Sequence, residues 1–255
     1  MKAAGRRPVS AVVISFNEGR NIGACLESLR WADEIVVVDS GSSDGTPEIA
    51  RRYTDKVFEV PWKGFGPQKQ AAVERASHDM VLNVDCDERV TPALAAEIEG
   101  LLAGEDVAAA YTVPRRTFVG EKEIRHCGWY PDRTTRLFDR TKARFTADLV
   151  HERVDVSGER RPLGNPLLHR SFTGIGEILG KMNRYSDLSA RQMFERGRKG
   201  NVIDVTLRPG FAFFKAYFLR LGFLDGFEGY VISATTALLT FTKYVKLREL
   251  ERKRS

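Results

Sequence analysis

The chain has 255 residues, which is long enough for one large α/β domain or for one domain with a substantial appendage. Its 42% hydrophobic and 29% charged residues are ordinary for a soluble globular protein. The three cysteines lack paired spacing, which argues against a disulfide framework and a zinc site and indicates a reducing compartment. The net charge of +6 is concentrated, since six Lys and Arg fall within residues 243–255. Such clusters suit nucleic acid, anionic lipid or phosphate-rich substrates alike.

The first hundred residues are predicted to alternate strands with helices. Residues 1–8 are predicted to be a disordered lead, because the apolar run that follows is too short for a signal peptide. Apolar runs at 10–16, 34–40, 56–60 and 79–85 are followed by helical patterns at 21–32, 45–53, 66–76 and 91–103. Thr46-Pro47 and Thr91-Pro92 each supply a capping hydroxyl and a first-turn proline. These features predict βαβ units and a mainly parallel sheet covered on both faces.

The second half of the chain has a different texture. Residues 108–172 predict short antiparallel strands and loops at a sheet edge, and residues 176–197 predict an amphipathic helix. Region 209–245 holds seven of the fifteen Phe, and its longest uncharged stretch, 229–242, is shorter than the roughly 20 residues of a spanning helix. We expect two aromatic helices with basic flanks that lie in a membrane interface. A helix pair packed on the rest of the chain, or a dimer interface, remains the alternative.

Polar side chains follow three of the predicted strands. Because the carboxyl ends of parallel strands meet at one edge of a sheet, where ligands bind, we expect these side chains to share a crevice. The first strand supplies Ser15, Asn17 and Glu18, the second supplies Asp39 and Ser40, and the fourth supplies Asp85, Asp87 and Glu88.

The chemistry of these residues favours a nucleotide and a divalent cation. An Asp just after the second strand, Asp39, accepts hydrogen bonds from a ribose or a base, but no G-x-G-x-x-G turn and no G-x-x-x-x-G-K-[ST] motif is present. A nicotinamide or flavin cofactor is therefore disfavoured. Asp85 and Asp87 form a D-x-D pair of hard oxygen ligands, which suits Mg²⁺ or Mn²⁺ bound beside a diphosphate.

The order "VVISFNEGRNI", "IVVVDSGSSDGT", "VLNVDCDE" resembles the GT-A domain of inverting family-two glycosyltransferases. More narrowly, "WADEIVVVDSGSSDGT", "GFGPQKQAAV", "LNVDCDERV", "GWYPDRTTRLF" and "LVHERV" resemble lipopolysaccharide-core β-1,4-glucosyltransferases, from about residue 9 to about residue 172. The resemblance implies a GT-A, Rossmann-like, mainly parallel sheet with flanking helices over 9–172. Residues 173–255 are then a C-terminal, amphipathic helical region.

The resemblance also implies roles for individual residues. Asp85 would meet the ribose and metal region, Asp87 would be the main metal ligand, and Lys69 would reach the phosphates of the nucleotide. Ser15, Asn17 and Glu18 would border the nucleotide, and Asp39 would read its base.

Inversion at the sugar needs a general base for the acceptor hydroxyl. The candidates downstream of the D-x-D are Asp132, Asp148, Glu152 and Asp155, and the family pattern points to Glu152, with Asp132 next. His151 is either a further metal ligand or a structural hydrogen-bonding residue. Arg133 and Arg136 would bind donor or acceptor phosphate, or else form a solvated strand face.

The leading hypothesis is a metal-dependent inverting hexosyltransferase, peripheral on the cytoplasmic face of the cell membrane. It would move glucose from UDP-glucose to a lipid-linked acceptor such as the lipopolysaccharide inner core. One alternative keeps the fold and uses a polyprenyl phosphate acceptor or another nucleotide sugar. A third hypothesis is a non-catalytic basic protein that binds membrane or nucleic acid. It accounts for the charge of +6 but leaves Asp39, Asp85, Asp87 and Glu152 without a role, so no nucleic-acid partner is expected.

Overall fold

The computed structural model describes residues 5–146 and 153–254, and the chain divides into two compact units. The first unit comprises Met1–Arg115 and Arg133–His169, and the second comprises Arg116–Asp132 and Arg170–Ser255. The division falls inside three strands, so each of them has residues in both units. The boundary predicted between residues 172 and 173 remains a prediction.

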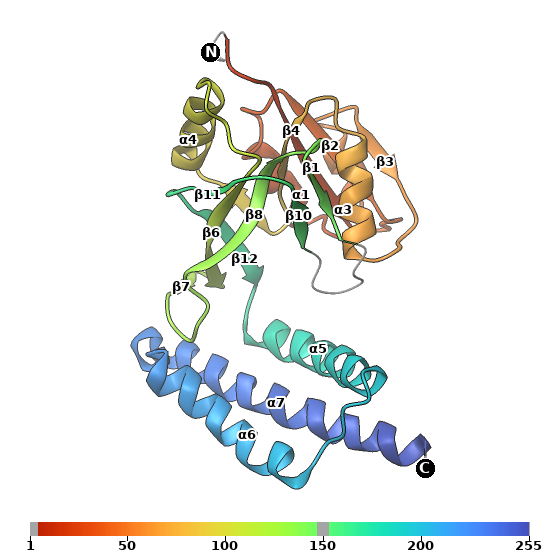
Figure 1. The fold of residues 1–255 in the computed structure, drawn as a ribbon, viewed down its shortest axis with the longest axis vertical. Helices are drawn as coiled ribbons and strands as arrows, with labels where there is room; N and C mark the ends of the chain where they lie inside the picture. The colour runs from red at the N-terminus through yellow and green to blue at the C-terminus, as the bar shows by residue number, and fades with distance from the viewer. Residues whose placement is uncertain (1–4, 147–152, 255) are drawn as a thin grey trace. The chain divides into compact units, whose positions relative to one another are not determined.

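A mixed, mainly parallel sheet forms the centre of the first unit (Figure 1). Its strands follow the order β3-β2-β1-β4-β8-β6-β12-β5, with β11 beside β6, and β9 and β10 form a separate antiparallel pair. The strands β1 to β4 are parallel, and β8 runs antiparallel to β4. The bounds are β1 Val9–Ser15, β2 Glu34–Asp39, β3 Val57–Glu59, β4 Met80–Asn83, β5 Glu88–Val90, β6 Ala110–Val119, β8 Asp132–Asp139, β9 Ala143–Phe145, β10 Val154–Val156, β11 Arg160–Pro162 and β12 Leu167–Phe172.

Helices cover both faces of this sheet because successive side chains of its central strand point to opposite sides. In β1, Ala11 and Val13 pack in one apolar cluster with residues of α1 and α4, whereas Val12 and Ile14 pack in another with residues of α3. All of β1 is buried, as the continuous apolar run predicts for a strand covered twice. The helices are α1 Ile22–Glu27, α2 Thr46–Ala50, α3 Phe65–Glu74 and α4 Pro92–Leu102.

The two predicted helix caps have different outcomes. The Thr91 hydroxyl accepts a 3.1 Å hydrogen bond from the Leu94 amide and caps α4, as predicted. The Thr46 hydroxyl instead accepts a 2.9 Å hydrogen bond from the backbone amide of Glu18, and Gly45 precedes α2 without a side-chain cap. The predicted cap was wrong, because Thr46 is itself the first residue of α2 and its hydroxyl oxygen accepts from the loop after β1. The predicted first-turn proline, Pro47, is present.

The second unit contains the C-terminal helices and the short strand β7, Lys122–Ile124, which pairs with the end of β6. Its helices are α5 Ile175–Glu195, α6 Val202–Phe214 and α7 Gly226–Arg254. A π-helical turn, Lys215–Leu219, and a 3₁₀ turn, Gly222–Asp225, connect α6 to α7. Helix α7 lies between α5 and α6 and packs against both (Figure 1). Within the described residues, none of the helices combines the length and apolar character that crossing a bilayer requires.

The predicted fold class is confirmed: a mixed, mainly parallel sheet with helices on both faces, followed by C-terminal helices. The helix over 176–197 is found as α5, but the aromatic region is organised differently from the expected pair. Helix α6 begins before this region, at Val202, and α7 extends through the basic residues to Arg254.

Candidate functional site

The carboxyl ends of β1 and β2 lie side by side and bring two of the predicted residues together. Ser15 and Asp39 are partners in the register of these parallel strands, and the Ser15 hydroxyl donates a 2.7 Å hydrogen bond to Asp39 Oδ1. Both side chains are buried at the carboxyl ends of these strands. The expected juxtaposition of these two strand ends is therefore present.

Asp39 holds the loop that follows β2 by accepting backbone and hydroxyl hydrogen bonds. Its Oδ2 accepts from the amides of Gly41 at 2.9 Å and Ser42 at 2.7 Å, and the Ser42 hydroxyl donates to Oδ1 at 2.6 Å. The Asn17 amide donates to Ser42 Oγ at 2.7 Å, and Asn17 Oδ1 accepts from the Ser43 amide at 2.9 Å. These bonds tie the loops after β1 and β2 into one polar surface.

Asn17 adopts a left-handed backbone conformation, with φ of 54°. Asn accepts this conformation more readily than most residues, and the turn directs the chain from β1 toward α1. Glu18 Oε2 then accepts a 2.8 Å hydrogen bond from Asn21 Nδ2 at the start of α1. Asn17 and Glu18 thus lie in the loop between β1 and α1, and their predicted contact with a nucleotide stays a prediction.

Asp85 lies between two cations just beyond β4. The Lys69 ammonium is 2.9 Å from Asp85 Oδ1, and the Arg136 guanidinium is 2.6 Å from Oδ2. Burial alone raises the pKa of Asp85, but the charges of Arg136 and Lys69 outweigh it and hold the pKa well below its ordinary value. Asp85 is therefore ionised across the physiological pH range.

Arg136 is a buried link between Asp85 and a second acid. It is 3% exposed, and its guanidinium donates to Asn83 Oδ1 at 2.9 Å and to Glu88 Oε1 at 2.5 Å. Burial lowers the pKa of Arg136, whereas the charges of Asp85 and Glu88 outweigh this and raise it above its ordinary value. Glu88 is fully buried, and its Oε2 accepts a 3.0 Å hydrogen bond from the Asp85 amide. This bond fixes the turn after β4. Arg136 therefore positions the carboxylate of Asp85.

The sequence suggests that the three acids after β4 converge on one point, but the structure divides them. Asp85 and Glu88 both accept hydrogen bonds from Arg136 Nη2, whereas Asp87 lies against His169 of β12. The Nε2 atom of His169 is 3.3 Å from Asp87 Oδ2. His169 is placed there because β12 pairs antiparallel with β5, with His169 opposite Glu88.

His169 and Asn83 are site residues that the sequence did not assign, whereas Glu88 was expected at this edge without a role of its own. His169 stands in the short run "NPLLHRSF", which carries no motif, and only the pairing of β12 with β5 brings it to Asp87. Across residues 5–146 and 153–254, three or more His, Cys, Asp and Glu side chains are nowhere grouped so as to hold an ion by themselves. Asp87 and His169 could therefore supply at most two of the ligands that a metal ion needs.

Two further predicted residues lie at the start of β8. Arg133 is exposed, and its guanidinium donates to the Leu163 carbonyl at 2.9 Å. Asp132 is the first residue of β8 and belongs to the second unit. His151 and Glu152 lie outside the described residues.

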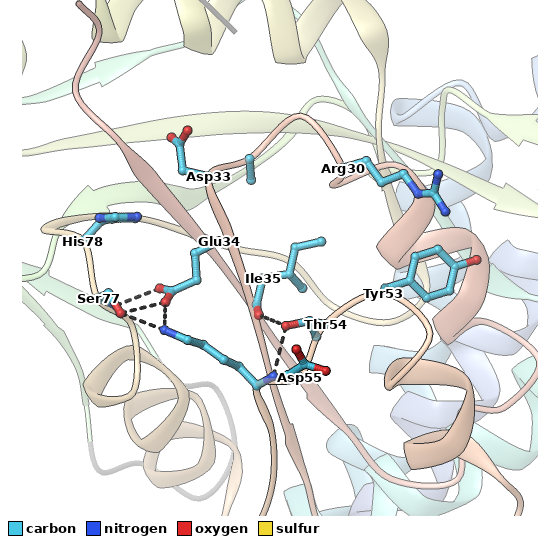
Figure 2. A pocket seen from close by; sticks show the side chains of 11 residues that line it. Arg30, Asp33, Glu34, Ile35, Tyr53, Thr54, Asp55, Ser77 and His78 are labelled. Carbon is cyan, nitrogen blue, oxygen red and sulfur yellow. Dashed lines mark hydrogen bonds and ion pairs between the residues drawn. The ribbon is translucent and has the colours of Figure 1, made fainter. Parts of the chain in front are cut away.

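A separate hollow of about 590 Å³ lies near the start of β2, at the opposite end of that strand from Asp39. Figure 2 shows Glu34 and Ser77 pointing toward each other in it, with Ile35 and Thr54 beside them. Glu34 binds Lys56, the Ser10 hydroxyl at 2.5 Å, and both the amide and the hydroxyl of Ser77 at 2.7 Å. These bonds occupy both carboxylate oxygens, so Glu34 serves to join β1, β2 and the loop before β4.

We expect Glu34→Gln to lower the free energy of unfolding at pH 7 by at most about 3 kcal/mol. Burial raises the pKa of Glu34, but the hydrogen bonds from Lys56, Ser10 and Ser77 outweigh it and lower the pKa to about 2. Because the folded pKa is depressed, this stability is present above the ordinary value of 4.5 and is lost as pH falls toward 2. Urea unfolding of both proteins from pH 7 downward measures this, and a difference that does not shrink below about pH 4 contradicts it.

Comparison with known proteins gives a consistent set of relatives. The glycosyl transferase family 2 model matches residues 10–157. The chain is 33% identical to the lipopolysaccharide core biosynthesis glycosyltransferase LpsC of Rhizobium meliloti, over 94% of this chain and 92% of that protein. It is also 33% identical to an uncharacterized glycosyltransferase of Rickettsia bellii, over 96% and 87%. The mannosyltransferase PcManGT of Pyrobaculum calidifontis, solved with GDP-Man and Mn²⁺, superposes with a TM-score of 0.56 at 16% identity, over 95% of this chain and 87% of that one. This likeness shows a shared fold.

Proposed function

The chain belongs to glycosyl transferase family 2 and is therefore a glycosyltransferase, and we propose that it moves a hexose from a nucleotide sugar to a lipid-linked saccharide with inversion. The proposed donor is UDP-glucose, and the proposed acceptor is a saccharide such as the inner core of lipopolysaccharide. The relative named for lipopolysaccharide core biosynthesis, which matches most of the chain, supports this acceptor class.

The observation that carries the proposal is the arrangement of charges beyond β4. Asp85 is held ionised by Lys69 and Arg136, while Asp87 lies next to His169 at the same turn. A glycosyl donor leaves a nucleoside diphosphate, whose negative charge grows as the bond to the sugar breaks, and fixed cations stabilise that charge. Lys69 contributes a buried cation on the diphosphate side of the proposed site.

The loops after β1 and β2 would bind the nucleoside. Asp39 holds the backbone amides of Gly41 and Ser42 in place, so the loop that would meet the base is fixed before the donor binds. Asn17 and Glu18 border the same loop and would face the ribose and base. A preformed loop of this kind reduces the ordering cost of binding.

The residues present fit a divalent cation. The Asp87 carboxylate and the His169 imidazole offer one oxygen and one nitrogen donor, and Asp85 adds negative charge nearby. Mg²⁺ and Mn²⁺ sites in nucleotide enzymes commonly use one or two carboxylates together with the substrate phosphates, so an incomplete protein shell suits this role. When bound, the cation offsets the charge of the departing diphosphate.

The acceptor hydroxyl must lose a proton as it attacks the anomeric carbon from the side opposite the diphosphate. We assign Glu152 as the general base that takes this proton, with Asp132 as the alternative. The oxygen–carbon bond to the acceptor forms while the bond to the diphosphate breaks, which inverts the anomeric configuration. The sequence "LVHERV" and its resemblance to the family pattern support Glu152.

A transfer assay tests the function. The purified full chain is incubated with Mn²⁺, one of UDP-glucose, UDP-galactose or GDP-mannose, and either a lipid-A-linked inner-core saccharide or a polyprenyl phosphate. We expect transfer from UDP-glucose to the saccharide, with a β-linked product by proton NMR. Transfer only to the polyprenyl phosphate replaces the acceptor class, and an α-linked product or no transfer from any donor overturns the proposal.

We expect Glu152→Gln to lower kcat by about a hundredfold, the lower end of what a general base contributes, with little change in the KM for the donor. Asp132→Asn, measured in the same assay, should change kcat far less. The reverse order of the two variants would move the base to Asp132. A dependence of kcat on pH that is lost in Glu152→Gln would further support the assignment.

A further inference from the structure

The second unit exposes a continuous apolar face. Ile203, Leu207, Phe211, Phe214 and Phe218 recur every three or four residues, and this spacing places them on one side of α6 and the π-helical turn after it. Their exposed fractions lie between 47% and 66%.

The turn between α6 and α7 extends the apolar face. Four further apolar side chains are exposed there and at the start of α7: Leu221, Phe223, Leu224 and Phe227. An exposed apolar surface that is continuous over a helix and a turn marks an interaction site.

Around the apolar face the acidic side chains are buried and the basic side chains are exposed. Between residues 196 and 227 the only acids are Asp204 and Asp225, and both are buried in this structure. Asp204 pairs with Arg208, and Asp225 Oδ1 lies 2.8 Å from His126 Nδ1. The six basic residues of the same segment are all exposed: Arg196, Arg198, Lys199, Arg208, Lys215 and Arg220. The acids of this segment therefore contribute no charge to the surface, and the apolar face has a basic border.

Arg208 and Lys215 are seven residues apart, so they lie on the same flank of the apolar face. Near Arg208 the cations are crowded. Arg198, Arg208 and Lys243 all lie between 5.3 and 5.6 Å from the ring centre of Tyr244. Burial lowers the pKa of Lys243, and the charges of Arg198 and Arg208 lower it further. An anion placed at this flank would relieve the repulsion among them.

We propose that this apolar face, with its basic border, binds the surface of a membrane that contains anionic phospholipid. The aromatic and aliphatic side chains enter the boundary between head groups and acyl chains, while the exposed Lys and Arg side chains contact the lipid phosphates. Lys and Arg suit this border because their long stems remain in apolar surroundings while their charged ends reach the head groups.

A second copy of the chain fits this surface less well than a membrane does. In a two-fold dimer the same patch meets itself, so the basic border of one copy would face the basic border of the other. Like charges at such a contact oppose association, whereas an anionic lipid surface complements them.

The inference would place the proposed enzyme at the surface that carries its lipid-linked acceptor, and it rests on the proposed function only for that consequence. Its test uses vesicles without any saccharide acceptor. Loss of vesicle binding and loss of glycosyl transfer are then separate results.

The test measures co-sedimentation of the full chain with vesicles of phosphatidylcholine alone or mixed with phosphatidylglycerol. We expect binding to the mixed vesicles, weakened by salt, and little binding to phosphatidylcholine. The variant Leu207→Ser/Phe211→Ser/Phe214→Ser should bind about a hundredfold more weakly, because three inserted side chains are lost. The variant Lys199→Gln/Lys215→Gln should bind about thirtyfold more weakly, since each cation near an anionic surface contributes about a factor of five.

The matched control is Tyr185→Ser/Leu188→Ser, which changes exposed apolar side chains on α5, on the other side of α7, and should bind like the wild type. As a second measurement, Phe218→Trp should show a blue-shifted emission when mixed vesicles are added. Absence of wild-type binding, equal binding by the triple variant, or an unshifted tryptophan emission overturns the proposal. So does a wild-type dimer in light scattering that the triple variant alone dissociates.

Discussion

Replacing Asp87 by alanine is expected to lower kcat/KM by about a thousandfold and to remove the Mn²⁺-dependent part of nucleotide binding. A cation that offsets the charge of a departing diphosphate is worth several kcal/mol in the transition state, and about 4 kcal/mol corresponds to a thousandfold. The Asp87 side chain is 23% exposed and lies 3.3 Å from His169 Nε2, so the variant removes a carboxylate that is in partial contact with solvent. The loss should therefore appear in activity and not in folding.

Isothermal titration with UDP measures the binding part of this prediction, first with Mn²⁺ and then with EDTA. Asp79→Ala is the matched control, because Asp79 directly precedes β4 and lies at the other end of the strand from Asp87. His169→Ala should weaken the Mn²⁺-dependent binding in the same direction as Asp87→Ala. Equal Mn²⁺-dependent binding by the wild type and Asp87→Ala would falsify the assignment of the metal to this turn.

Replacing Arg136 by methionine is expected to lower the free energy of unfolding by about 3–5 kcal/mol, which is the usual cost of removing one partner from a buried ion pair. Methionine keeps much of the volume, so the loss comes from charge. Glu88 is fully buried and would be left without its closest cation among the described residues, and Asp85 would lose one of the two cations that hold it. Urea unfolding followed by circular dichroism measures the effect.

Two further variants separate charge from packing. Arg133→Met removes an exposed guanidinium three residues earlier in the same strand and should change the free energy of unfolding by less than about 0.5 kcal/mol. Arg136→Met/Glu88→Gln should recover part of the lost stability, because it removes the unpaired charge. If Arg136→Met is as stable as Arg133→Met, the ion pairs beneath Asp85 contribute nothing to the fold.

Local sequence patterns were sufficient to predict the strands and helices in the first hundred residues of the chain. Continuous apolar runs such as the one in β1 predict strands buried on both faces, and these strands are present with the helices that the sequence places between them. The position of Asp39 after β2 follows from the same rule, because an acid directly after a buried strand lies at the carboxyl end of the sheet. The family was also recognisable from motifs within these segments, and the match over residues 10–157 confirms it.

The partners of the acids could not be predicted in the same way. Arg136 was assigned to phosphate or to a solvated strand face, yet it is buried between Asp85 and Glu88, because β8 pairs antiparallel with β4. His169 reaches Asp87 through the pairing of β12 with β5. Each contact joins segments far apart in the sequence, and no local spacing encodes their register.

The sequence by itself determined where the central strands lie to within one or two residues, which family the chain belongs to, and that acids stand at one edge of the sheet. Only the tertiary structure decided what each acid contacts, that Asp204 and Asp225 are buried, and that an apolar face with a basic border is exposed on the second unit. The physical reason is that hydrophobic periodicity and turn chemistry act over a few residues. Ion pairing, burial and exposure depend on which distant segments pack together.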